Sequence, residues 1–485
     1  MPPSLALLAG LGLSLTLILR EEIKGRPVSA GSWLPTFWMC IVGSRMVGQW
    51  LAVLGLGGGV PEVPEDGSSL DAAVFLTLIL GGMAVLAYRA VRPGIVARQN
   101  VWLLLFVAYG FIAILWSDFP FIAFKRWIKT LGHPIMALVI LTDRNPGEAL
   151  QRVIKRFAFL HVPLSIVVIK YFPAIGRGFD HWTGMPEDHG INVNKNELGY
   201  VCMLLAIFFA WSLFFASRTR GLLSRGQEIL INVGFLLMVG WLLYRADSAT
   251  SLVCSVLGIA TLLLLKLPLV SPRRVGTYVV LAVVVVFVLE TTFDLYEQLI
   301  VLLGRDPTLT DRTEVWADLL AFDINPVLGA GFETFWLGER REALWAKWWW
   351  QPNQAHNGYL ETYLNLGMVG VALLVAMCVS AYRKSQAVLV GDRAAGAFRL
   401  AILFAVLTYN YTEATFKAVH LVWTFFHFAA LDYVMPVRRI ARKRQSRPKR
   451  RRRELAGATQ GTDRHEATDE DRLPSFPGDA SRASA

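Results

Sequence analysis

Residues 228–270 read EILINVGFLLMVGWLLYRADSATSLVCSVLGIATLLLLKLPLV, which is two apolar runs separated by a short polar step. The runs, 228–244 and 249–270, each approach the roughly 20 apolar residues that a helix needs to cross a bilayer. The step between them, 245–250, is polar and short. This stretch predicts two spanning helices that are joined at one face of a membrane.

Similar apolar runs recur along the 485 residues, 54% of which are hydrophobic. That content in a chain of this length disfavours a soluble globular protein. We therefore predict an all-α fold, a polytopic transmembrane helix bundle with about 12–13 spans. The run at 127–141 is short, so a re-entrant or tilted segment is an alternative there. The predicted spans are 4–19, 33–56, 70–88, 101–116, 127–141, 153–172, 197–216, 228–244, 249–270, 276–303, 357–382, 398–412 and 419–436.

Lysine and arginine in the short loops predict which loops are cytoplasmic. Basic connections alternate with a second set, the predicted outer loops 57–69, 117–126, 172–196, 245–250, 304–356 and 411–417. We predict four parts: transmembrane helices with short loops (1–303), a large, partly helical periplasmic loop that carries the catalytic groups (304–356), further transmembrane helices (357–436), and a cytoplasmic tail (437–485). The tail is basic and then poor in core-forming residues, which predicts disorder and attraction to anionic lipid rather than to nucleic acid.

Metal and redox chemistry find little support in the sequence. Cys40, Cys202, Cys254 and Cys378 all lie in apolar stretches and lack the short paired spacings of metal sites or disulfide frameworks. Histidines and acids at 177–189 also match no standard ligand set. We expect neither a metal nor a cofactor.

The large outer loop carries groups that suit sugar transfer. The inner loops are too short to hold a nucleotide-binding domain, so a sugar transferase of this kind would use a lipid-linked donor. Arg312 could grip a diphosphate with its planar guanidinium, or form a salt bridge with Asp311 or Glu314. His356 could take a proton from a sugar hydroxyl near neutral pH, or serve as a helix cap or interfacial residue.

Other charged and aromatic residues near the predicted outer face could have either a functional or a structural role. Arg245 ends a span, where a cation needs a partner or an anionic ligand; it could also snorkel or pair with Asp247. The three tryptophans at 348–350 suit sugar rings or an interfacial belt. We expect Lys195 and Arg177, in the smaller outer loop, to orient glycan or phosphate.

Several separated motifs resemble one known family. Residues 308–316, TLTDRTEVW, resemble its TLTGRTxxW; 326–336 resemble PLLGxGFxxFW; and 355–370 resemble AHNGYLExxLxxGxxG. Residues 194–199 are similar to hKNxLG, and 248–252 to SxTxL. In this order and spacing, they resemble the O-antigen ligase and polymerase superfamily, and within it the exopolysaccharide polymerases of the succinoglycan type.

The resemblance implies an activity and a set of site residues. In the ligase branch, two arginines and a histidine act on an undecaprenyl-diphosphate sugar without metal; His356 and Arg312 match them. Arg245 is the candidate for the other arginine, although it precedes the step that here reads Ser-Ala-Thr. We expect Asn357, Glu361 and Trp336, which lie in the motifs, to bind substrate along with the lysine and arginine of the smaller loop.

The predicted function is polymerisation of undecaprenyl-diphosphate-linked oligosaccharide units into exopolysaccharide at the periplasmic face of the bacterial inner membrane. The enzyme would be an inverting glycosyltransferase, with the lipid bilayer and a chain-length regulator as further partners. Ligation of the glycan to lipid A-core is the alternative, because the branches share these motifs. Transport of a lipid-linked sugar is disfavoured because the mid-span segments hold almost no charge and show no repeat. A structural membrane anchor is a further alternative, in which the histidine and arginines would be replaceable.

Overall fold

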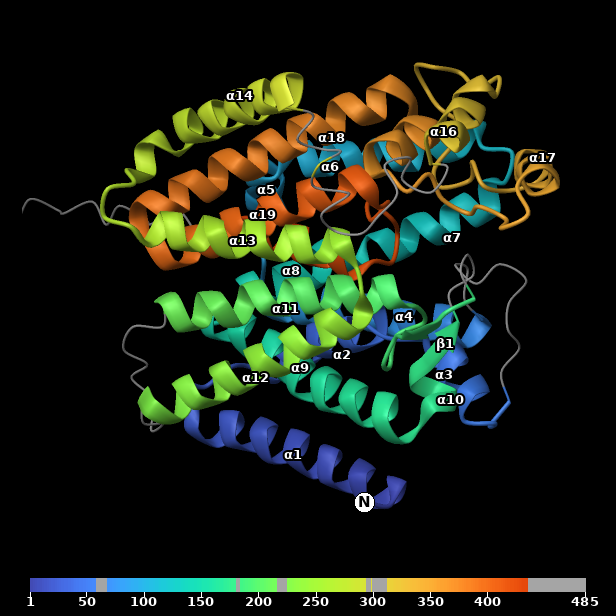
Figure 1. Cartoon of the computed structure of the whole chain (residues 1–485). Coiled ribbons are helices and arrows are strands. Elements are labelled where there is room, and N and C mark those ends of the chain that lie inside the picture. The colour runs from blue at the N-terminus through green and yellow to red at the C-terminus, as the bar shows by residue number, and fades with distance from the viewer. Residues whose placement is uncertain (58–67, 180–183, 216–224, 294–297, 299–311, 435–485) are drawn as a thin grey trace, which may run out of the picture. The chain divides into compact units, whose positions relative to one another are not determined.

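A computed structural model of the chain describes residues 1–57, 68–179, 184–215, 225–293, 298 and 312–434 (Figure 1). Met1–Val434 forms one compact unit. The predicted tail at 437–485 and residues 304–311 of the large loop lie outside the described residues. The elements are α1 (Pro3–Lys24), η1 (Ala30–Ser32), α2 (Trp33–Val42), α3 (Val47–Val53), α4 (Ser69–Tyr88), α5 (Pro93–Gln99), α6 (Val101–Ile112), η2 (Ala113–Trp116), α7 (Pro120–Thr130), α8 (Gly132–Leu141), α9 (Pro146–Tyr171), α10 (Pro173–Gly176), β1 (Arg177–Phe179), β2 (Pro186–Asp188), α11 (Lys195–Phe215), α12 (Arg225–Ala246), α13 (Ala249–Lys266), η3 (Pro272–Arg274), α14 (Val275–Phe293), α16 (Arg312–Ala321), α17 (Glu339–Lys347), α18 (Gly358–Gly391), α19 (Arg393–Thr412) and α20 (Leu421–Ala430).

The predicted all-α, polytopic fold is confirmed. In the described part of the chain, eight helices are long and apolar enough to cross a membrane: α1, α4, α11, α12, α13, α14 with its η3 turn, α18 and α19. The number rises to nine if α5 and α6 with η2, which meet at 99°, make one broken span. The prediction of 12–13 spans is therefore higher than the count of helices that pass this test.

The predicted number of spans exceeds the observed number of spanning helices because several apolar runs are interrupted. The run at 33–56 is divided between α2 and α3, and the run at 127–141 between α7 and α8. The last run forms only the ten residues of α20. All but the last residue of the run at 153–172 lies in α9, which is long enough but carries several charges. Hydropathy detects apolar content, but it does not detect where a helix bends, stops or buries ions.

Helix α11 lies at the centre of the unit. It packs against α12, α13 and α19, and 78% of its most apolar stretch is buried, compared with 6% for α14. Because α11 is apolar all round, it can be covered on every side by other helices. Helix α14 presents its apolar surface outward, as a helix facing lipid would.

Side-chain contacts divide the connections into two groups. Arg245 in the 245–250 step contacts Asp188 in the 172–196 loop, and Ser117 bonds Thr334 in the large loop at 2.8 Å. We call this side of the bundle the loop end; in Figure 1 it is the right-hand side, with α16 and α17 above and β1 and α10 below. Predicted inner segments also contact one another: Arg152, in the connection 144–156, lies 3.4 Å from Glu22, in the connection 20–26.

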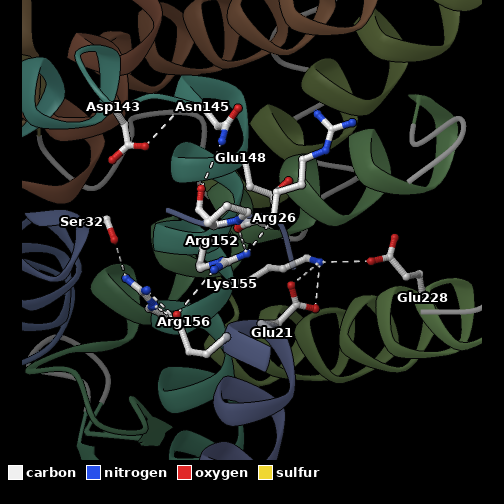
Figure 2. A network of polar contacts seen from close by, with 12 residues as sticks. Glu21, Arg26, Ser32, Asp143, Asn145, Glu148, Arg152, Lys155, Arg156 and Glu228 are labelled. Carbon is white, nitrogen blue, oxygen red and sulfur yellow. Dashed lines mark hydrogen bonds and ion pairs between the residues drawn. The ribbon is translucent and has the colours of Figure 1, made fainter. Parts of the chain in front are cut away.

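A buried ionic network fastens α9 to its neighbours at the opposite end, which we call the network end (Figure 2). Lys155 lies 3.1 Å from Glu21 of α1 and 3.7 Å from Glu228 of α12. Arg156 lies 2.6 Å from Glu22 and stacks over the ring of Trp33 at 4.0 Å. Paired in this way, the charges of α9 are tolerated inside an otherwise apolar bundle.

The backbone of α18 breaks at Gly367, and this break joins two of the sequence motifs. Gly367 has φ 62°, and a Cβ there would lie 2.3 Å from the carbonyl carbon of Val327. Around the break, Met368 N–H donates to the Pro326 carbonyl at 2.9 Å. The segment at 326–336 is thereby held by its backbone against the 355–370 segment, and only glycine fits their closest approach.

Candidate active site

His356 lies immediately before α18, where the chain enters the bundle. The Asn357 side chain caps this helix by accepting hydrogen bonds from the N–H groups of Tyr359 and Leu360, each at 3.0 Å. His356 itself adopts φ 48°, a left-handed conformation that is uncommon for a residue other than glycine. Its Nδ1 lies 3.2 Å from Oε2 of Glu413, in the loop after α19.

Arg312 approaches the other oxygen of the same carboxylate. It begins α16, and its Nη2 lies 3.3 Å from Oε1 of Glu413. Its Nη1 donates to the carbonyl of Thr412. Of the partners suggested by the sequence, Asp311 lies outside the described residues; among the described residues, Arg312 forms an ion pair with Glu413. Two predicted site residues are thus brought together by one acid that the sequence reasoning missed.

Glu413 is buried, and its surroundings keep it ionised. Burial by itself raises the pKa of Glu413, but the hydrogen bond from His356 and the charges of His356 and Arg312 lower the pKa below its usual value. An ionised carboxylate at this distance favours the tautomer that has its proton on Nδ1 of His356. Gln354 is farther from the same nitrogen, at 3.5 Å. The Nε2 atom is then left as the acceptor that a general base requires.

One signal in the sequence could have identified Glu413. It is the one acid in the predicted outer loop 411–417. Its backbone carbonyl also accepts the N–H of Gly358, at 3.1 Å, which fixes this loop against the start of α18. However, Glu413 lies far along the chain from His356, and only the fold brings them together.

Arg245 belongs to a second cluster at the loop end. It forms an ion pair with Asp188 of the β1–β2 hairpin. Asp188 also lies 3.5 Å from Arg177, its register partner in the β1–β2 hairpin, and Lys195 lies 3.9 Å from Glu187. Three predicted cations therefore gather around the acids of one hairpin.

The two clusters are linked through the start of α13. Thr250 Oγ1 lies 3.0 Å from Thr412 Oγ1, and the carbonyl of Thr412 accepts the bond from Arg312. The Ser-Ala-Thr step of the motif thus contacts the turn that carries Glu413.

Glu361 and Trp336 are bonded to each other. Trp336 Nε1 donates to Glu361 Oε1 at 2.7 Å, and Ala355 N–H donates to Oε2 at 2.9 Å. Asn365 donates to Oε1 as well, at 3.1 Å. These bonds fix the residue that precedes His356, so the geometry supports a positioning role for this pair more directly than contact with substrate.

A cavity of about 340 Å³ opens beside this site. Gln354 and Glu413, the two residues within reach of Nδ1 of His356, both line it. Its volume is in the range of sites for small molecules. The lining also includes the charged residues Arg126, Lys129, Glu197, Glu333 and Lys417 and the tyrosines Tyr200 and Tyr409.

The tryptophans at 348–350 differ in their surroundings. Trp348 donates to Asp318 at 2.9 Å and packs with Trp350 against the small apolar core of the large loop. Trp349 is 67% exposed. Of the three, it is the one placed to contact sugar or membrane interface.

Comparison with known proteins gives two matches. Residues 233–375, which include Arg245, Arg312 and His356, match the family described as O-antigen ligase. The chain is also 24% identical over 300 residues to the exopolysaccharide production protein ExoQ of Rhizobium meliloti (strain 1021). That alignment covers 58% of this chain and 64% of the relative. The resemblance predicted from the motifs is confirmed.

Proposed function

We propose, with this likeness as the premise, that the chain polymerises polyprenyl-diphosphate-linked oligosaccharides into an exopolysaccharide. The observation that carries the proposal is the joining of His356 and Arg312 on Glu413, beside a cavity that can receive a substrate. The family match covers both of the predicted residues. The ExoQ relative, named for exopolysaccharide production, favours a polymer as the product.

In the proposed reaction, Nε2 of His356 takes the proton of an acceptor sugar hydroxyl. The hydroxyl oxygen then forms a bond to the anomeric carbon of the donor sugar. The bond from that carbon to the diphosphate breaks, and its electron pair leaves with the polyprenyl diphosphate. A single displacement of this kind inverts the anomeric configuration.

Each neighbour of the base has a part in this reaction. Glu413 holds the imidazole in its tautomer and stabilises the imidazolium that forms. Arg312 balances the charge of Glu413 and lies where negative charge builds on the departing diphosphate. Arg245, which pairs with Asp188 of the hairpin, contributes a second cation that stabilises the departing diphosphate. We place this site at the periplasmic face of a bacterial inner membrane, in agreement with the basic residues at the opposite loops.

A gene deletion tests the proposed product. Lipid-linked glycans and surface polysaccharide are extracted from the native host with and without the gene, and both are sized. Accumulation of single lipid-linked repeat units with loss of long polymer is expected. An unchanged profile would contradict the proposal.

Ligation is the second candidate, because the family that matches is described as O-antigen ligase. A ligase transfers a finished chain, so its loss leaves long lipid-linked chains that do not reach their final acceptor. The same extraction separates the two: short lipid-linked units indicate a polymerase and long ones a ligase. A chain-length regulator that co-purified with the chain would be a further partner of the proposed polymerase.

A further inference from the structure

Three polar side chains that the proposed reaction does not use meet at one side of the 340 Å³ cavity. Glu197 and Tyr200 lie in the first two turns of α11, three residues apart, so their side chains project from the same side of the helix. His420, the residue before α20, lines the cavity as well, and its ring centroid lies 4.5 Å from that of Tyr200. Groups from two helices are thus gathered beside the proposed site.

Glu197 contributes a carboxylate that has a structural contact but no counter-ion. Its Oε2 accepts the N–H of Val193 at 3.1 Å, and the side chain of Asn194 accepts the N–H of Glu197 at 2.9 Å, so these contacts help to begin α11. Among the described residues, no basic side chain forms an ion pair with Glu197, and Arg45 acts on it only from farther away. Glu413, which lines the same cavity, is instead paired with an arginine and a histidine. The carboxylate of Glu197 is therefore available to a ligand that donates hydrogen bonds.

His420 and Tyr200 contribute the complementary groups. Nδ1 of His420 accepts the N–H of Val422 at 3.2 Å and so caps α20. A nitrogen that accepts a hydrogen bond carries no proton, so the ring is neutral and its proton lies on Nε2. In the part of the chain that the structure describes, neither this N–H nor the Tyr200 hydroxyl forms a hydrogen bond. The cavity is thus lined by an acceptor, a donor and a hydroxyl that can do both.

This combination fits the hydroxyl groups of an uncharged sugar. Each hydroxyl can donate a hydrogen bond to a carboxylate and accept one from an imidazole N–H. The aromatic rings supply an apolar face against which a sugar ring can pack. A phosphate or an acidic sugar would be repelled by Glu197, and an apolar chain would leave all three polar groups without partners.

We propose that Glu197, Tyr200 and His420 form a subsite that binds the hydroxyl groups of a neutral sugar in the glycan substrate. Naming the ligand as a glycan rests on the proposed function. Gln354 and Glu413, the neighbours of the general base, line the same cavity, so a sugar held at the subsite occupies the space beside the reacting groups. Two sources share this chemistry: the acceptor chain and the sugar of the lipid-linked donor.

Binding measurements test the subsite without relying on turnover. The full chain with His356→Asn, which prevents reaction, is placed in lipid nanodiscs. Three probes are titrated separately: neutral oligosaccharides from partial acid hydrolysis of the native host's surface polysaccharide, lipid-linked glycans extracted from the same host, and undecaprenyl diphosphate without sugar. The same oligosaccharides with every hydroxyl O-methylated serve for comparison, because they cannot donate hydrogen bonds.

The variants remove one polar group each and keep the local structure. Glu197→Gln can still accept the N–H of Val193, and Tyr200→Phe keeps the ring. His420→Asn keeps a side chain that caps helices well but removes the Nε2 donor. The matched controls are Glu342→Gln and Tyr244→Phe, at exposed positions that are not among the cavity's lining residues.

We expect Glu197→Gln to raise the Kd of a sugar-bearing probe about tenfold or more, because hydrogen bonds to a charged group are lost. Tyr200→Phe and His420→Asn should raise it about threefold or more, since they remove neutral hydrogen bonds. The control variants should leave it unchanged, and every variant should bind undecaprenyl diphosphate as the parent does. An effect on the free oligosaccharides assigns the subsite to the acceptor chain. An effect on the lipid-linked glycans alone assigns it to the donor.

The proposal is overturned if the three subsite variants bind every sugar-bearing probe as the controls do. It is also overturned if the O-methylated oligosaccharides bind as tightly as the free ones, or if the parent prefers no sugar-bearing probe to its sugar-free counterpart. Failure of the proposed function gives a different result. Loss of sugar binding in the subsite variants, together with an unchanged glycan profile after gene deletion, would uphold the subsite and reject the polymerisation.

Discussion

His356 is held where a base should be, but in a conformation that most side chains disfavour. Its φ of 48° is tolerated best by glycine and asparagine. His356→Asn should therefore retain the fold while removing the base. We expect the rate of sugar transfer to fall by about 10²- to 10⁴-fold, measured with purified protein and lipid-linked donor. A variant that is present in the membrane at its normal level and still makes normal polymer would show that His356 is not the base.

Glu413 gives a pH-dependent prediction. Because its pKa is lowered in the folded protein, the stabilisation that it gives is complete above the usual carboxyl pKa and is lost as the pH falls through the folded value. Glu413→Gln should reduce the free energy of unfolding by roughly 1–3 kcal/mol at pH 7, because hydrogen bonds to a charged group are lost.

The difference between wild type and Glu413→Gln should shrink as the pH falls below the usual carboxyl pKa. Denaturant unfolding in detergent at several pH values measures it. A difference that grows as the pH falls would mean that Glu413 is not ionised in the folded state.

At the scale of single residues, the sequence predicted part of the site. His356 and Arg312 could be found because each lies in a motif, and the structure joins them. Glu413 could be noticed as the one acid of its loop, but its role could not be predicted, because that role depends on a contact with His356 across 57 positions of sequence. Arg245 was expected near the diphosphate, but the ion pair that holds it comes from a hairpin whose folding no local pattern revealed.

At the scale of elements, the break in α18 links two motifs through glycine. Gly367→Ala would place a Cβ against the Val327 backbone at a positive φ. We expect a loss of 2 kcal/mol or more, on the order of the cost of a strained backbone plus overpacking. Thermal unfolding in detergent measures it. Gly240→Ala in α12 is the control: no atom lies within 4 Å of the added Cβ, so its effect should be neutral or slightly stabilising. Equal effects of the two changes would contradict the assigned role of the break.

The ionic network of α9 gives a second prediction at this scale. Lys155→Met removes the cation between Glu21 and Glu228, leaving the buried carboxylate of Glu21 without it, and should cost about 3–5 kcal/mol of unfolding free energy. Adding Glu21→Leu should recover part of the loss. Arg20→Gln, whose contact with Gln227 is exposed, should change stability by less than about 0.5 kcal/mol. A Lys155 variant as stable as the Arg20 control would show that the network does not hold the helices together.

The sequence predicted that the elements are helices better than it predicted where each helix begins and ends. Long uninterrupted apolar runs such as those of α11 and α12 were found as single helices. The errors lie where tertiary contacts override hydropathy. The charges of α9 are stable because other helices supply counter-ions, and the apolar runs at 33–56 and 127–141 are each divided between two helices.

At the scale of the whole molecule, the remaining question is which end of the bundle faces the periplasm, and labelling can decide it. Lysine and arginine place the loop end outside. In a chain whose four cysteines are replaced by alanine, Trp349→Cys and Leu269→Cys put single thiols at opposite ends, on residues that are 67% and 87% exposed. A membrane-impermeant maleimide added to spheroplasts should label the cysteine at 349 and spare that at 269, whereas detergent should expose both. The reverse pattern would put His356 and its cavity on the cytoplasmic side, away from the lipid-linked glycans of the outer leaflet, and the proposed polymerisation could not occur there.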